Sequence, residues 1–320
     1  MAQHFLLSAA ARTLSLRAIY KAGEEAAYDT FRKMRWQDTD GEAVCPRCGH
    51  DEAYDIATRR KFKCKRCLHQ FSVTSGTIFA SRKMAFVDLL AAICITVNAA
   101  KGVSMLQLSR DLDCQYKTAF VLAHKLREAM ALEVHTGEVL DGHVEVDGAY
   151  FGGHVRPENR KEDRKDRRLK ENQSPRRRVV VAFRERYGRT LPIVVRAEAE
   201  GVPLALEHVH RLATMLADEA SHWDALHAGW PVQRVNHSLV YSDHGKHTNW
   251  VESYFSRLRR MVAGQHHHVS PQYLHQYATH AAWLEDNRRT DNGGLGRRLV
   301  ANAMGSPVSR NWAGYWQRAA

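Results

Sequence analysis

The chain has 320 residues, of which 44% are hydrophobic and 26% are charged, and its formal net charge at neutral pH is +12. This length allows a sizeable core and two or three domains, and the hydrophobic share excludes a disordered chain. The positive surplus favours a polyanionic partner, above all nucleic acid, although a solvated basic surface without a partner has the same charge balance.

Residues 1–40 predict a helical N-terminal segment, because their apolar side chains can share one side of a helix; these are Phe5, Leu6, Ala9, Leu14, Leu16 and Ile19. A secretory signal is not predicted, since no basic residue precedes the short apolar run. The longest apolar stretch, residues 85–100, is shorter than the ~20 residues of a membrane span and contains Asp88. We therefore expect no membrane partner and a cytoplasmic protein with reduced cysteines.

Residues 41–80 contain two cysteine pairs, Cys45 with Cys48 and Cys64 with Cys67, in the spacing C-x2-C-x15-C-x2-C. Each pair can direct two thiolates at one point, and two pairs complete a tetrahedron around Zn²⁺. A single C-x-x-C pair leaves redox chemistry open, but two pairs at this spacing favour a structural zinc ribbon. Because such a ribbon buries little core, the metal would supply folding free energy. The ribbon is rich in Lys and Arg, which makes it a candidate for phosphate contact.

Residues 81–135 predict a helix-turn-helix-like segment. A first helix is expected from Ser81 or Lys83 to about Asn98, and Gly102 ends it. A short helix capped by Ser104 and a longer helix follow, separated by a turn with the dimensions of a helix-turn-helix. The start of the longer helix would present four residues to a DNA major groove, namely Gln115, Tyr116, Lys117 and Thr118. An ordinary helical hairpin is the alternative.

Residues 140–290 predict a sheet in which acidic residues end apolar strands. In "HVEVDGAYFGG" the valines alternate with Glu145 and Asp147, so both carboxylates lie on one face of a strand. Further strands are expected near residues 178–183 and 190–197, and a short strand ends at Asp218. The segment "HTNWVESYFSRLRRMV" has the apolar period of a helix and carries Glu252.

Two aspartates and a glutamate from three elements form a plausible oxygen site for Mg²⁺, and two such ions suit phosphodiester chemistry. Each acid also has a simpler explanation. Glu252 can form a capping box with Asn249, and Asp218 can cap a turn. Asp224 and Asp243 are the other candidates for the second acid.

A basic stretch from Arg156 to Arg178 lies between the first two predicted strands of this sheet. It includes the run Arg176, Arg177 and Arg178 and is placed to follow a DNA backbone beside Asp147. The alternative is a solvated disordered loop. The triple histidine at residues 266–268 favours packing or phosphate contact over metal binding, because three adjacent side chains do not face one ion from a helix.

The blocks "CPRCG", "FKCKRC", "VEVDGAYFGG" and "HTNWVESYFSRLRR", in this order, resemble insertion-sequence DDE transposases of the zinc-ribbon, ISXO-like branch. The resemblance covers roughly residues 11–289. It implies an α/β protein whose ribonuclease-H-like catalytic domain, a mixed sheet with flanking helices, follows a zinc ribbon and a helical segment. It assigns the three acids to Asp147, Asp218 and Glu252, and it implies two catalytic Mg²⁺ or Mn²⁺ ions beside the structural zinc.

The chain departs from the family pattern after the first acid, where Gly148 and Ala149 replace an acid and a hydroxyl residue. A lysine common seven residues after the glutamate is Arg259 here, which keeps the charge but changes the geometry. Arg259 is therefore included among the catalytic candidates, and the activity of this copy is left open.

The expected function is a DNA transposase that binds the terminal inverted repeats of its element, cleaves the strand ends by metal-dependent hydrolysis and transfers the 3′-OH ends into target DNA. Its partners would be double-stranded DNA, at the element ends and at the target, and further copies of itself in a homodimer or higher oligomer on nucleoid-associated DNA. The alternative is a catalytically inactive zinc-ribbon DNA-binding protein, such as a repressor or a domesticated relic. Residues 291–320 are expected to form a C-terminal tail.

Overall fold

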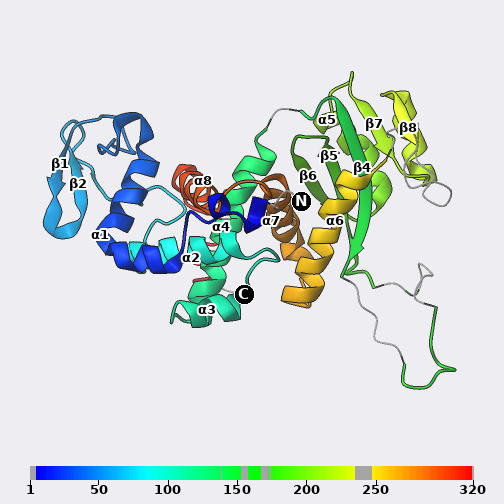
Figure 1. Ribbon diagram of the computed structural model, residues 1–320, viewed down its shortest axis with the longest axis horizontal. Helices are drawn as coiled ribbons and strands as arrows, with labels where there is room; N and C mark the ends of the chain where they lie inside the picture. Colours follow the sequence, from blue (N-terminus) through cyan, green and yellow to red (C-terminus); the bar gives the residue numbers. More distant parts are fainter. Residues whose placement is uncertain are drawn as a thin grey trace. The chain divides into compact units, whose positions relative to one another are not determined.

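The computed structural model describes residues 5–137, 139–152, 158–166, 172, 174–234 and 247–318 (Figure 1). The chain forms two compact units: unit 1 contains residues 1–133 and 287–320, and unit 2 contains residues 134–286. Within these described ranges, no helix combines the length and the hydropathy needed to cross a membrane.

The first long helix of unit 1 begins later than the sequence pattern predicts. Residues Phe5–Leu7 and Ala9–Ala11 form short 3-10 turns, and helix α1 spans Leu16–Arg35. Ser15 sets this start, because its backbone is extended and its hydroxyl accepts a hydrogen bond from the Ala18 amide at 3.2 Å. The prediction that Phe5 and Leu6 share a helix with Ile19 is therefore wrong.

Helix α2 spans Phe86–Asn98, so the predicted start at Ser81 or Lys83 is also wrong. Ser81 has a φ of 60°, in the left-handed region, and Ala85 is extended, so neither position continues a right-handed helix. The predicted end at Asn98 is confirmed. Helix α3 follows at Met105–Asp111 and helix α4 at Tyr116–His135.

The C-terminal part of the chain returns to the N-terminal part through helix α8, Asn292–Gly305. The Asn292 side chain accepts hydrogen bonds from the amides of Thr13 and Leu14 at 2.8 and 2.9 Å and donates one to the Leu14 carbonyl at 2.7 Å. The expected C-terminal tail therefore includes a helix that packs against α1 and α2.

The ribbon of unit 1 is a small antiparallel sheet of strands β1 (Ala53–Ile56), β2 (Lys61–Cys64) and β3 (Gln70–Phe71). Its apolar side rests on an aromatic cluster. The rings of Trp36 and Phe62 lie 5.5 Å apart, and those of Phe62 and Phe71 lie 5.6 Å apart. These buried rings, together with the buried Cys45 and Cys64, contribute much of the small interior of the ribbon.

Unit 2 is built on a mixed sheet with the strand order β6-β5-β4-β7-β8. Strands β4 (His143–Phe151), β5 (Arg178–Glu185) and β6 (Thr190–Val195) pair antiparallel. Strands β7 (Thr214–Ala217) and β8 (Val232–Arg234) run parallel to β4. This arrangement confirms the mixed sheet that the sequence predicts.

Helices cover both faces of this sheet (Figure 1). On one face, the valines of β4 and β5 form the core with α5 (Gly201–His208) and the 3-10 helix η7 (Ser221–Ala228). On the other face, β4 presents Glu145 and Asp147 on the side of α6 (Asn249–Met261), which packs against β4, β5 and α7 (Leu274–Asp286). The Tyr254 hydroxyl of α6 donates a hydrogen bond to the Ala278 carbonyl of α7 at 3.2 Å.

Candidate active site and metal centre

The four paired cysteines converge in unit 1. The Sγ atoms of Cys45, Cys48, Cys64 and Cys67 all lie within 4.8 Å of one another. Cys45 and Cys67 are 3.6 Å apart at sulfur, and so are Cys48 and Cys64. Four thiolates around tetrahedral zinc, with Zn–S bonds of ~2.3 Å, have S···S distances of about 3.8 Å. The donor set and its spacing therefore fit a structural zinc ion.

Both cysteine turns have the same backbone hydrogen bonds. The Cys45 amide donates to the His50 carbonyl and the Gly49 amide to the Cys45 carbonyl, at 2.8 and 2.9 Å. In the second turn, Cys64, Leu68 and His69 repeat these bonds at 3.0 and 3.1 Å. Gly49 and Leu68 both have a positive φ, of 71° and 58°. The left-handed conformation that a glycine adopts in the first turn is thus adopted by a leucine in the second.

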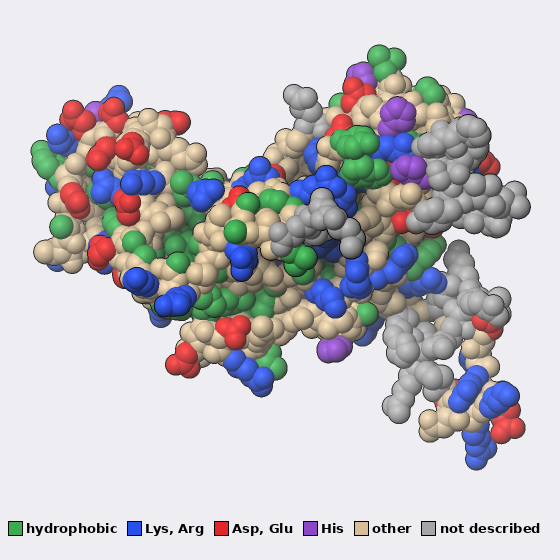
Figure 2. Space-filling view, in the orientation of Figure 1, with side chains coloured by type: hydrophobic (Ala, Val, Ile, Leu, Met, Phe, Trp, Pro, Cys, Tyr) green, Lys and Arg blue, Asp and Glu red, His purple; other side chains and the backbone are tan. Residues whose placement is uncertain are grey.

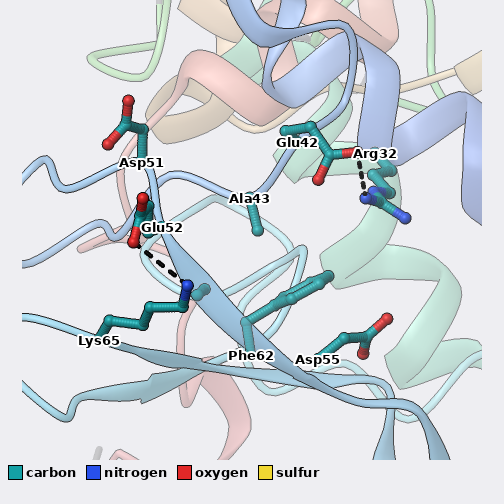
Figure 3. Close-up of a pocket in the computed structure, with 9 residues that line it drawn as sticks. Arg32, Glu42, Ala43, Asp51, Glu52, Asp55, Phe62 and Lys65 are labelled. Carbon is teal, nitrogen blue, oxygen red and sulfur yellow. Dashed lines mark hydrogen bonds and ion pairs between the residues drawn. The ribbon is translucent and has the colours of Figure 1, made fainter.

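One face of the ribbon carries mixed charge. A cavity of about 300 Å³ is lined by Arg32 and Lys65 and by four acids, Glu42, Asp51, Glu52 and Asp55 (Figure 3). Arg32 pairs with Glu42 and Lys65 with Glu52, each at 3.2 Å. Figure 2 shows the same mixture of red and blue side chains over the ribbon. This cavity therefore does not suit phosphate, and any phosphate contact of the ribbon must use another part of its surface.

The helix-turn-helix-like segment has the predicted elements. The Ser104 hydroxyl caps α3 by accepting a hydrogen bond from the Gln107 amide at 3.1 Å. Residues 112–115 separate α3 from α4. The four predicted DNA-facing residues, Gln115, Tyr116, Lys117 and Thr118, are all exposed at the start of α4. Their exposure is compatible with a DNA contact, and their pairing with DNA stays a prediction.

In unit 2, strand pairing places the first two predicted acids side by side. Strands β4 and β7 are parallel, and Val146 pairs with Ala217. One further step in this register places Asp218 next to Asp147. Side chains at paired positions of neighbouring strands share a face, so both carboxylates lie on the side of the sheet that α6 covers. Asp147 accepts a hydrogen bond from the Gly148 amide at 2.7 Å, and Asp218 accepts one from the Ala220 amide at 3.1 Å.

The surroundings of Asp147 favour its protonated form. Burial, with the neighbouring charges of Asp218 and Glu198, raises the pKa of Asp147 to about 7, although the Gly148 amide and the Arg259 guanidinium act in the opposite direction. Carboxylates held this close repel each other unless a proton or a cation compensates their charge. In the absence of a cation, the proton on Asp147 compensates this charge.

The third predicted acid, Glu252, lies in the first turn of α6. Its carboxylate accepts a hydrogen bond from the Thr248 hydroxyl at 3.0 Å. The capping box with Asn249 is absent, because Thr248 precedes the helix and Asn249 is its first residue. The side-chain oxygen of Asn249 is buried and has no hydrogen-bond partner among the described residues. An unpaired amide oxygen one turn from Glu252 is a suitable oxygen ligand for Mg²⁺.

The start of α6 is held by Glu145, a residue that sequence reasoning did not assign to the site. Glu145 is fully buried and accepts hydrogen bonds from the amides of Trp250 and Val251 at 2.8 and 3.0 Å. It also pairs with Arg186 at 2.8 Å. The buried carboxylate therefore fixes the first turn of α6, which carries Glu252, to the strand that carries Asp147. The sequence feature that could have identified Glu145 is its position two residues before Asp147, on the same face of the strand.

Glu198, in the turn after β6, was also missed. A side chain at Gly148 would overlap the Glu198 carboxylate, so the glycine leaves the space that this carboxylate fills. Glu198 lies 3.7 Å from His222, and its charge raises the pKa of Asp147. No local pattern in the sequence connects residue 198 with residue 148.

The remaining candidates lie in different surroundings. Arg259 is exposed on α6, and its positive charge acts to lower the pKa of Asp147. Asp224 lies on η7 and pairs with Arg234 at 3.0 Å, and Asp243 lies outside the described residues. Arg178 begins β5 opposite Phe151, and Arg177 stacks over the Tyr150 ring at 3.9 Å. The preceding Arg176 is exposed.

The carboxylates of Asp147, Asp218 and Glu252 do not all lie within ligand distance of one another. Among the described residues, the four cysteines are the only group of three or more potential ligands whose ligand atoms all lie within 4.8 Å of one another. Asp147 and Asp218 are adjacent, whereas the Glu252 carboxylate is bonded to Thr248. In the histidine run, the ring of His266 packs against Tyr277 at 4.7 Å, in agreement with the packing interpretation.

Two known protein families match parts of the chain. The family described as "ISXO2-like transposase domain" matches residues 139–286, and the family described as "transposase zinc-ribbon domain" matches residues 22–70. No curated protein matches the chain. The first match covers the strands and helices that carry the acids and implies a ribonuclease-H-like fold, and the second covers all four zinc-ribbon cysteines. The chain therefore belongs to the ISXO2-like family of DDE transposases and carries the zinc ribbon of that family.

Proposed function

We propose that this transposase cleaves the ends of its element by metal-dependent hydrolysis and joins the resulting 3′-OH ends to target DNA. The observation that carries this proposal is the register of β4 and β7, which sets Asp147 beside Asp218 on the face that α6 covers. The first turn of α6 adds Glu252 and the unpaired oxygen of Asn249. Four oxygen donors from three elements suit a pair of hard divalent cations.

Asp147, Asp218 and Glu252 would hold two Mg²⁺ or Mn²⁺ ions. When bound, these ions activate a water molecule or a 3′-OH and stabilise the leaving oxygen of the phosphodiester. Asp147 must lose its proton before it can act as a ligand, and the nearby Arg259 favours that loss. Glu252 would contribute its carboxylate, which accepts a hydrogen bond from the Thr248 hydroxyl. Glu145 would hold the turn that carries Glu252 in place.

DNA would bind to surfaces on both units. Gln115, Tyr116, Lys117 and Thr118 begin an exposed helix of the kind that enters a major groove. Arg176, Arg177 and Arg178 lie at the end of β4 beyond Asp147, where they would contact the phosphate backbone. Because two element ends must be joined to one target, the active complex is proposed to contain at least two copies of the chain.

The test compares binding with chemistry in the full-length protein. Asp147→Asn, Asp218→Asn and Glu252→Gln should each abolish strand cleavage and strand transfer with Mg²⁺, while binding to a duplex with the terminal repeats stays near the wild-type level. The reason is that the acids act on charge that develops in the transition state, whereas binding depends on basic groups elsewhere. Asp141→Asn, at an exposed acid before β4, is the matched control.

If wild-type protein binds the end duplex but never cleaves it with Mg²⁺ or Mn²⁺, the proposal fails. The chain would then act as a DNA-binding protein with an inactive catalytic domain. Gly148 and Ala149, which replace the residues expected after the first acid, would be the first positions to examine in that case.

A further inference from the structure

Unit 1 contains a cavity that lies outside the residues matched by either family, 22–70 and 139–286. Its volume is about 630 Å³. It is lined by the loop before α2, by the start of α4 and by C-terminal residues between Val308 and Gln317. Gln115, Lys117 and Thr118, which are predicted to face DNA, form part of its wall.

The charged side chains of this wall are all cations. Arg82, Lys83, Lys117 and Lys125 line the cavity, and no described residue that lines it is acidic. The cavity on the ribbon, where four carboxylates stand beside two basic side chains, shows that an excess of basic side chains is not a general property of unit 1. The charge of the cavity therefore complements an anionic ligand.

Aromatic rings form the C-terminal wall. Trp312 stacks on His124 with ring centroids 4.2 Å apart, and Phe120 of α4 packs against Tyr315 and Trp316 at 5.7 and 5.6 Å. Trp316 is still 43% exposed, and the Lys117 ammonium lies 5.3 Å from its ring. An exposed ring that is held in place beside a cation provides both a surface for stacking and a contact for phosphate.

We propose that this cavity binds single-stranded DNA, with an unpaired base against Trp316 and the neighbouring phosphates against Lys117 and Lys125. Basic grooves with aromatic platforms bind single strands in this way, independently of sequence. The cavity has the size of a small-ligand pocket, which admits one or two nucleotides but not a duplex. Because its wall includes the start of α4, an unpaired strand could continue into it from a duplex held by that helix. This proposal rests on DNA being the partner, as the proposed function states.

The test measures binding of a fluorescein-labelled (dT)12 strand to the full-length protein by fluorescence anisotropy. Trp316→Ala should weaken binding by about tenfold or more, the range expected for loss of one stacked base. Trp316→Phe, which keeps an aromatic face, should retain most of the affinity. Lys117→Ala should also weaken binding, and the exposed Lys101, which does not line the cavity, provides the matched control in Lys101→Ala.

Three results would overturn the proposal. The first is (dT)12 binding by Trp316→Ala at wild-type affinity, and the second is an equal loss in Lys101→Ala and Lys117→Ala. Displacement of the strand by an equally charged oligoglutamate peptide, with the same dependence on Trp316, would also overturn it, because the occupant would then be an acidic polypeptide. Thermal unfolding and zinc content establish that each variant is folded. Cleavage of the end duplex is measured separately, so its absence would refute the proposed function without affecting Trp316-dependent binding of (dT)12.

Discussion

At the scale of single residues, the chemistry of the site depends on where each carboxylate finds a compensating partner. Asp147 lies beside Asp218 and close to Glu198, and its pKa is raised to about 7 by burial and by these charges. Glu145, two residues earlier on the same strand face, instead has Arg186 and two helix amides as partners. On the same strand, Glu145 therefore stabilises the structure, whereas Asp147 stays available to bind a cation.

The raised pKa of Asp147 predicts a pH-dependent stability. The folded state keeps a proton up to about pH 7 that the unfolded state loses near its ordinary pKa of 3.8, so the metal-free protein loses stability as pH rises between these values. Asp147→Asn cannot ionise. We therefore expect it to equal the wild type below pH 4 and to exceed it by roughly 1–4 kcal/mol above pH 7. Urea unfolding without added Mg²⁺ measures this, and identical pH profiles for both proteins would contradict it.

Removing the charge of Glu145 should destabilise unit 2. Glu145→Gln leaves Arg186 without its carboxylate and weakens the contacts to the Trp250 and Val251 amides, for an expected loss of about 3–5 kcal/mol. Cleavage should fall further than DNA binding, because the turn that carries Glu252 is released. Urea unfolding and cleavage rates measure both effects. Glu207→Gln, at a 70% exposed side chain, should change stability by less than about 0.5 kcal/mol, and an equal loss there would refute the assignment.

At the scale of elements, the two cysteine turns of the ribbon adopt the same conformation with different residues. Gly49 adopts a positive φ at little cost, because it has no Cβ. Leu68 adopts nearly the same conformation at a cost of about 1–2 kcal/mol, and its side chain is 61% exposed, so packing does little to offset that cost. The second turn is therefore held in place by its hydrogen bonds and by the metal ligands.

The different residues at these two positions predict that substitutions at Leu68 and at Gly49 change the stability of the ribbon in opposite directions. Leu68→Gly should stabilise the zinc-bound ribbon by up to about 1 kcal/mol, because it removes the left-handed strain. Gly49→Ala should destabilise it by about 1 kcal/mol, although no atom lies within 4 Å of the added Cβ. Thermal unfolding of the two variants at equal zinc occupancy gives the comparison. A loss of stability in Leu68→Gly would show that its side chain matters more than its backbone.

Local patterns predicted the elements that carry the site. The helical period marked α6, and an apolar run that ends in an acid correctly marked Asp218, which directly follows β7. The same pattern was wrong for Asp147, which lies inside β4 because the strand continues to Phe151 in register with β5. Contacts between distant residues could not be read in this way. Glu145 binds the amide of Trp250, 105 residues later, and this contact takes the place of the capping box that Asn249 and Glu252 suggested. Glu198 fills the space beside Gly148, although the two residues are 50 positions apart in the sequence (198 − 148).

At the scale of the whole molecule, the two units depend on different sources of stability. Unit 2 has a sheet core of buried valines, with Trp223, Leu226 and Trp230 on the helical side. The ribbon of unit 1 rests on a few buried aromatic rings and on its four cysteines, of which Cys45 and Cys64 are buried and Cys48 and Cys67 are partly exposed. Zinc should therefore matter for the structure of unit 1 and little for that of unit 2.

Zinc removal should separate the two units in experiment. We expect one zinc per chain in the purified protein and the loss of ribbon structure when a chelator removes it, while unit 2 keeps its resistance to proteolysis. The affinity of the protein for end DNA should fall when zinc is removed. In the zinc-bound protein, this affinity should fall steeply as the salt concentration rises, because many Lys and Arg side chains contact phosphate. Metal analysis, limited proteolysis and anisotropy measure these changes. A Cys45→Ser variant with full zinc content would refute the ligand assignment.

The assignment of the second acid is the point on which the whole account depends. Asp218 continues the register of β7 beside Asp147, whereas Asp224 is exposed and paired with Arg234. The most direct measurement is strand cleavage by Asp218→Asn and by Asp224→Asn, each incubated with Mg²⁺ and a duplex carrying the terminal repeats. The account predicts that Asp218→Asn is inactive and that Asp224→Asn cleaves at close to the wild-type rate. Cleavage by Asp218→Asn together with its loss in Asp224→Asn would contradict it and move the site to η7.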